Sequence, residues 1–77
     1  MGRPEITPVE FYAYEKVRLS GVTNMYMTRN VEMLSGLDQD TIRRIQTEDY
    51  TALREKYDVP AWVEEAAEEL RADYATT

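Results

Sequence analysis

Apolar residues recur along this chain every three or four positions, which is the spacing of one face of an α-helix. In the first such segment, Val9, Ala13 and Val17 are four residues apart. The apolar surface of this segment is widened by Phe11, Tyr12, Tyr14 and Leu19. No segment shows the alternation of apolar and polar residues that is typical of a strand. The pattern therefore predicts an all-α domain of four to five short helices. The expected helices cover residues 8–19, 28–35, 39–46, 50–57 and 58–77.

The first helix has clear signals at both of its ends. We expect Thr7 to be the N-cap, Pro8 the first helical residue, and Glu10 the partner of Thr7 in a capping box. Gly21 is expected to end the helix, because glycine readily adopts the left-handed backbone conformation that follows a last turn.

The two segments 28–35 and 39–46 together have the pattern of a helix-turn-helix. Gly36 is suited to end the first segment, and Asp38 is suited to cap the second. The apolar residues that would face one another across the turn are Val31, Leu34, Ile42 and Ile45. We therefore expect this pair at the centre of the bundle.

The connection before this pair, residues 22–27, is unusually apolar for a loop. We expect the side chains of Val22, Met25 and Met27 to pack into the core. A second interpretation makes Asn24 a buried polar latch, with an amide that bonds loop carbonyls and fixes the path into the next helix.

The segment 58–77 predicts an amphipathic helix with a strongly acidic outer face. It holds six acidic residues and one basic residue, so it carries a charge of −5 within the chain's total of −6. Its expected apolar stripe, at steps of four residues, is Trp62, Ala66, Leu70 and Tyr74. We expect Trp62 to belong to the core.

The remaining composition narrows the function classes. The chain has 77 residues, no Cys and no His, which leaves no thiolate nucleophile and removes the commonest general base and metal ligand. No apolar run approaches the roughly 20 residues that a membrane-spanning helix needs. We expect one cytoplasmic domain over residues 1–77, with a flexible lead-in at 1–6 and with no catalytic residue, cofactor or metal.

Residues 15–25, EKVRLSGVTNM, resemble a family of small proteins from phages and prophages of Gram-positive bacteria. That family has an E-x-V-R-x-[ST]-G-x-T-N-M core, then a helix that ends in glycine, and then an aromatic-rich stretch. Ser35–Leu37, Tyr50 and Tyr57 match the later parts, so the resemblance covers about residues 10–57. It implies a mobile-element setting and carries over no catalytic residue. The acidic segment lies outside it.

The leading functional interpretation is a non-enzymatic protein-binding module that inhibits host nucleic-acid-handling or defence machinery, as an anti-CRISPR protein does. A row of carboxylates on one rigid helix can imitate a phosphate backbone and occupy the basic channel of a partner protein. The expected partner-binding residues are Glu64, Glu65, Glu68, Glu69 and Asp73. The alternative for this face is an ordinary solvated helix surface.

A second interpretation is a helix-turn-helix regulator that binds DNA. Thr41, Arg43 and Arg44 would then contact the duplex. Asp38 and Asp40 would face phosphates at the start of the same helix, so nucleic acid is not the expected partner.

A third interpretation is a structural homo-oligomer. Folded chains of this length bury only about 60–65% of the surface that the unfolded chain exposes, so dimerisation is a ready source of stability. Trp62, Leu70 and Tyr74 would then pack between subunits.

Overall fold

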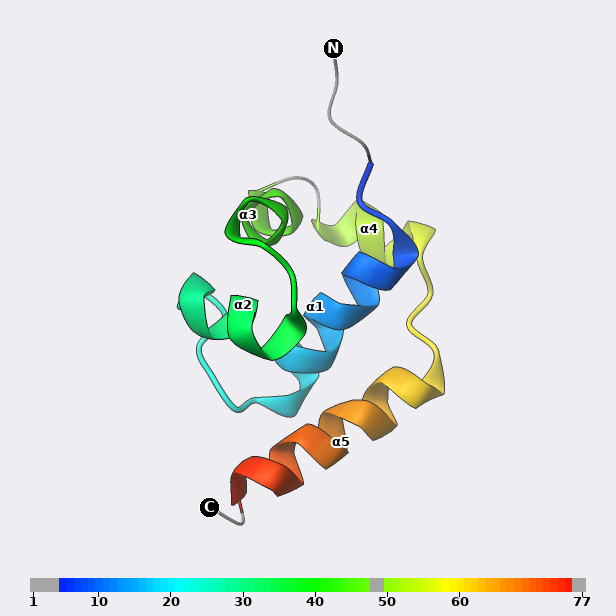
Figure 1. Cartoon of the computed structure of the whole chain (residues 1–77). Coiled ribbons are helices and arrows are strands. Elements are labelled where there is room, and N and C mark those ends of the chain that lie inside the picture. The colour runs from blue at the N-terminus through cyan, green and yellow to red at the C-terminus, as the bar shows by residue number, and fades with distance from the viewer. Residues whose placement is uncertain (1–4, 48–49, 76–77) are drawn as a thin grey trace.

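This computed structural model describes residues 5–47 and 50–75. These residues form five α-helices joined by loops, and they contain no strand (Figure 1). The all-α prediction is therefore confirmed. The helices are α1 (Pro8–Ser20), α2 (Thr28–Ser35), α3 (Gln39–Thr47), α4 (Tyr50–Lys56) and α5 (Ala61–Ala75).

The central element is α1, because α2, α3 and α5 all pack against it (Figure 1). Its predicted capping box is present. The backbone N–H of Glu10 donates to Thr7 Oγ1 over 3.2 Å, and the backbone N–H of Thr7 donates to Glu10 Oε1 over 2.9 Å. Gly21 ends the helix with a φ of 68°, in the left-handed region. Both predicted ends of the first helix are confirmed.

The buried face of α1 lies within the predicted apolar surface of this helix, but it leaves Val9 outside. Phe11, Tyr14 and Val17 are buried, whereas Val9 is 76% exposed. The reason is that aromatic side chains bury more area than valine or alanine, so the helix turns its aromatic face inward. Ile6, which was predicted to lie in a flexible lead-in, is also a core residue, and its carbonyl accepts a 2.8 Å hydrogen bond from the Tyr57 hydroxyl.

The α2–α3 pair forms the expected helical corner. Gly36 has a φ of 77° and ends α2, and its backbone N–H donates to the Glu32 carbonyl. Asp38 caps α3 by accepting a 2.7 Å hydrogen bond from the backbone N–H of Thr41. The inward residues are Val31, Ile42 and Ile45, all buried, and Leu34, which is half-buried.

The packing of α5 corrects the predicted apolar stripe. Val63 and Ala67 are buried and Leu70 is half-buried, while Trp62 is 56% exposed and Tyr74 is 52% exposed. Steps of four residues drift around a helix by about 40° each, so Trp62 and Tyr74 lie about 120° apart. Val63, Ala67 and Leu70 are spaced by four and then three residues, so they lie within about 60° of one another around the helix and form the seam that packs against α1. Trp62 therefore packs edge-on against Tyr12 at the rim, with ring centroids 5.9 Å apart.

Candidate protein-binding surface

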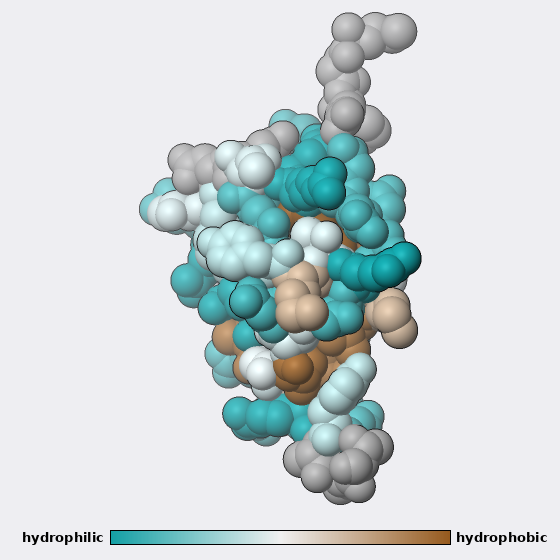
Figure 2. Space-filling model, turned by 90° about the vertical axis from the view of Figure 1, so that its left-hand side faces the viewer, coloured by the Kyte–Doolittle hydropathy of each residue, from teal (hydrophilic) through white to brown (hydrophobic). Residues whose placement is uncertain are grey.

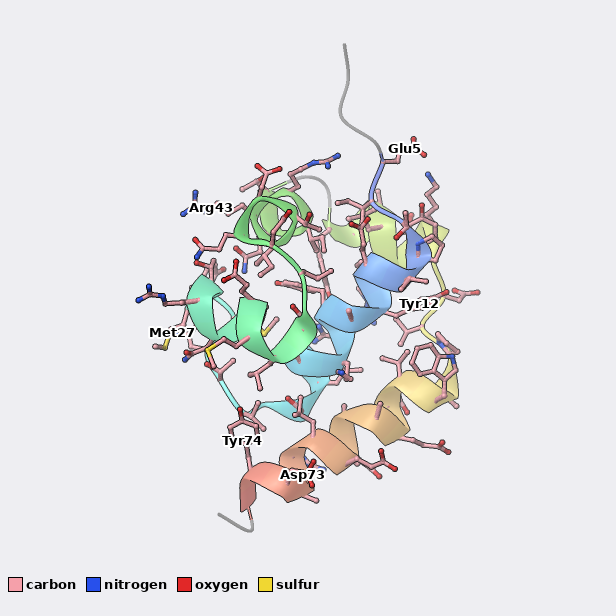
Figure 3. All side chains as sticks on the ribbon, viewed as in Figure 1. Glu5, Tyr12, Met27, Arg43, Asp73 and Tyr74 are labelled. Atoms are coloured by element: carbon pink, nitrogen blue, oxygen red, sulfur yellow. The ribbon has the colours of Figure 1, made fainter. Side chains whose placement is uncertain are left out.

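The outward face of α5 carries the predicted acidic residues. All five are exposed, and Figure 3 labels Asp73 near the C-terminal end of α5. Among the described residues, no ion pair forms with the four glutamates. The five residues are Glu64, Glu65, Glu68, Glu69 and Asp73.

The charge density of this face is close to that of a nucleic-acid strand. The stretch from Glu64 to Asp73 rises by about 13.5 Å along the helix axis. Its five acids and Arg71 give a net charge of −4, which is one negative charge per roughly 3.4 Å. One strand of B-DNA carries one charge per about 3.4 Å of helix axis. The face thus presents the line density of a single strand on a rigid support.

Local helix stability does not explain this arrangement. Glu64 and Glu68, Glu65 and Glu69, and Glu69 and Asp73 are like-charge neighbours at i,i+4, and each such pair destabilises a helix by about 0.2–0.5 kcal/mol. Asp73 also lies near the C-terminus of α5, where the helix dipole is negative. The three like-charge pairs therefore cost about 1 kcal/mol locally, which the position of Glu64 in the first turn of α5 partly offsets.

The residues of the DNA-binding alternative lie in a mixed environment. Arg43 is exposed, whereas Thr41 and Arg44 are half-buried. A surface hollow beside the start of α3 includes four acidic side chains. Its lining is Glu5, Thr7, Glu10, Asp38, Asp40, Thr41 and Arg44. A duplex that approached this end of α3 would bring phosphates against those carboxylates.

The structure contains a buried carboxylate that the sequence did not reveal. Glu15 has no exposed surface. Its carboxylate accepts hydrogen bonds from Arg18 over 2.6 and 3.2 Å and from the Tyr50 hydroxyl over 2.5 Å, and the Arg54 Nε atom lies 3.9 Å away. The spacing of Glu15 and Arg18 could have indicated a pair. Tyr50 and Arg54 come from α4, so no local signal could have shown this network.

This network shifts the pKa of two of its members. Burial raises the pKa of the Tyr50 hydroxyl above its usual range, and the hydrogen bond to Glu15 raises it further. The hydrogen bond to Glu15 likewise raises the pKa of Arg18. The arrangement links α4 to α1 by polar side chains and gives no residue an evident nucleophilic role.

The segment that carries the family resemblance makes specific hydrogen bonds in this structure. The Ser20 hydroxyl donates to the Val17 carbonyl over 2.6 Å, just before the turn at Gly21. The Met25 carbonyl accepts a 2.7 Å hydrogen bond from the Gln46 side chain. These contacts fix the path from α1 to α2.

Two expectations about the same loop are wrong. Met27 is 53% exposed and does not pack into the core. Asn24 is exposed and not buried, and its side-chain oxygen accepts a 2.9 Å hydrogen bond from the backbone N–H of Tyr26. Asn24 therefore shapes a local turn, while the contact to a distant element comes from Gln46.

Among the described residues, no group of three or more acidic side chains is placed to hold a metal ion. No helix in that part of the chain is long and apolar enough to cross a membrane. Comparisons with protein families, with curated proteins and with solved structures find no match for this chain.

Proposed function

We propose that this chain is a non-enzymatic protein-binding module whose acidic α5 face docks on a basic surface of another protein. The observation that carries the proposal is the exposed row of Glu64, Glu65, Glu68 and Glu69, which forms no ion pair among the described residues. These charges destabilise their own helix, so a role outside the helix accounts for them better than a role inside it.

The partner class follows from the charge density. A basic channel that binds nucleic acid is built to accept about one negative charge per 3.4 Å of each strand. The acidic face matches that density, and its long-range field would steer it toward such a channel. The resemblance of residues 10–57 adds a phage or prophage setting, in which inhibition of host nucleic-acid-handling or defence machinery, as by an anti-CRISPR protein, is the role that fits.

Affinity capture from a lysate of a Gram-positive bacterium tests this proposal. The parent chain should retain proteins that added DNA or RNA releases, because both compete for one basic channel. A variant in which Glu64, Glu65, Glu68 and Glu69 are all changed to Gln should lose that capture. It should keep its helical circular dichroism, because all four side chains are exposed.

A matched control separates the position of the charges from their number. Changing Glu5 and Glu55 to Gln, and Asp40 and Asp58 to Asn, removes the same four charges from exposed positions elsewhere. This control should retain the captured proteins. If it loses them equally, net charge and not the α5 face is responsible, and the proposal is wrong. Tight duplex-DNA binding that Arg43→Ala abolishes would instead support a DNA regulator.

A further inference from the structure

A second surface, formed mainly by α2 and the turn before it, is rich in exposed apolar side chains. We call it the α2 face, and it consists of Met27, Met33 and Tyr74, which are 53%, 80% and 52% exposed. Figure 2 shows this side of the molecule, with apolar atoms grouped in its lower half. Methionine and tyrosine are residue types that are enriched in protein interfaces.

The α2 face contains a hollow of about 160 Å³. Its walls come from the turn after α1, from α2 and from the end of α5: Val22, Thr23, Asn30, Met33, Leu34 and Tyr74. A cavity of about 150 Å³ is large enough to hold benzene. The hollow can therefore receive one apolar side chain from a neighbouring molecule.

Opposite charges border this face at its two edges. Arg29, one helical turn before Met33, is exposed, and so is Arg43 on α3. Figure 3 shows Arg43, Met27 and Tyr74 on one side of the molecule, with Asp73 beyond Tyr74 on α5. From one edge of the face to the other, the side chains are therefore first basic, then apolar and then acidic.

We propose that a second copy of this chain covers the α2 face. A two-fold axis through the apolar centre would place the basic edge of each copy on the acidic edge of the other. A methionine of each copy would then enter the hollow of its partner. Stable interfaces use about 800 Å² from each partner, which is about 15% of the 5308 Å² surface of this chain. In this arrangement the edges with Arg43 and Asp73 would contribute to that area together with the hollow.

The dimer interface and the proposed acidic docking site share one residue, Asp73, and are otherwise formed by different residues. Two chains of charge −6 repel each other, but at an ionic strength of about 0.15 M the Debye length is about 8 Å. At that ionic strength, repulsion between distant acidic faces is screened, while the contacts at the two edges are short. The Glu64-to-Glu69 row stays available to another protein.

Sedimentation equilibrium of the full chain at about 0.15 M ionic strength tests the dimer. The parent should show a concentration-dependent dimer, and Met33→Glu should be monomeric with unchanged circular dichroism, because Met33 is 80% exposed. Val9→Glu is the matched control, because Val9 is 76% exposed and does not line the hollow. It should dimerise like the parent.

Methyl NMR of the methionines gives a second readout. The signals of Met27 and Met33 should shift as concentration rises, while that of Met25, which packs against the core, should not. A parent chain that stays monomeric up to about 1 mM, or equal loss of the dimer in both glutamate variants, would overturn the proposal.

Discussion

The outward face of α5 and the α2 face lie on two helices that pack against the same central helix, α1, yet they offer opposite chemistry. The α5 face presents a row of carboxylates on a helix that this charge destabilises. The α2 face presents thioether and aromatic side chains that would be more favourable if covered. The interaction proposed for the first face is therefore electrostatic, and the interaction proposed for the second is apolar.

The largest loss of stability should come from disrupting the contact between α5 and α1. Ala67 is 2% exposed in the seam with α1. Ala67→Asp would bury an unpaired carboxylate there and should lower the free energy of unfolding by about 3–5 kcal/mol. Chemical denaturation followed by circular dichroism measures this loss. Ala72→Asp is the control on the exposed side of the same helix, and a similar loss there would contradict the assigned seam.

The next effect distinguishes the true seam of α5 from its rim. Val63 is fully buried, so Val63→Ala should lower stability by about 2 kcal/mol through lost apolar burial and a residual cavity. Trp62→Ala should cost less, about 1 kcal/mol, because the indole is 56% exposed and contributes mainly its edge-on contact with Tyr12. Thermal melts of the two variants in parallel give the order, and the reverse order would place Trp62 in the core.

The dependence of stability on pH tests the network around Glu15, which joins α4 to α1. The folded pKa of Tyr50 is raised above its unfolded value of about 10. Above that pH the folded chain therefore holds more protons than the unfolded chain, and stability falls as pH rises. Tyr50→Phe should cost about 1.5 kcal/mol near neutral pH through the lost bond to Glu15. It should also flatten the decline above pH 10. Urea titrations at several pH values measure both effects, and an unchanged slope would exclude Tyr50 as its source.

The smallest expected effect has the opposite sign. Glu68→Gln removes the like-charge neighbour of Glu64 and should raise stability by about 0.2–0.5 kcal/mol. Differential scanning calorimetry at low salt is the appropriate measurement, because added salt screens the repulsion. Glu55→Gln on α4 serves as the control. A loss of stability in Glu68→Gln would mean that this carboxylate supports the fold.

The parts of the fold that were predictable depend on short-range signals. Thr7 and Glu10 are three residues apart, and the turn at Gly36 needs only the glycine and its neighbours. The side of a helix that becomes buried depends instead on the elements that pack against it. For this reason Trp62 was expected in the core and is exposed, and Val9 lies on the predicted apolar surface of its helix and is exposed as well.

The two candidate surfaces also differ in how far the sequence alone predicts them. Carboxylates are rarely buried without a partner, so the exposure of Glu64 and its neighbours was predictable from residue type alone. The α2 face was not, because an apolar residue such as Met27 is expected inside the protein, and only the tertiary arrangement leaves it outside. Glu15 is the converse case, since its burial depends on Tyr50, 35 residues later.

The shallow attachment of α4 has a consequence for how the molecule opens. This helix has no buried residue: Tyr50 and Leu53 pack half-buried against the core, and the Tyr50 hydroxyl donates a hydrogen bond to Glu15. A short helix that buries no side chain fully can unfold locally at a free energy well below that of the whole domain. Its backbone amides should therefore exchange with deuterium sooner than those in the middle of α1. Proteases should cut the chain first near Leu53, while the packed core of α1, α2, α3 and α5 remains intact.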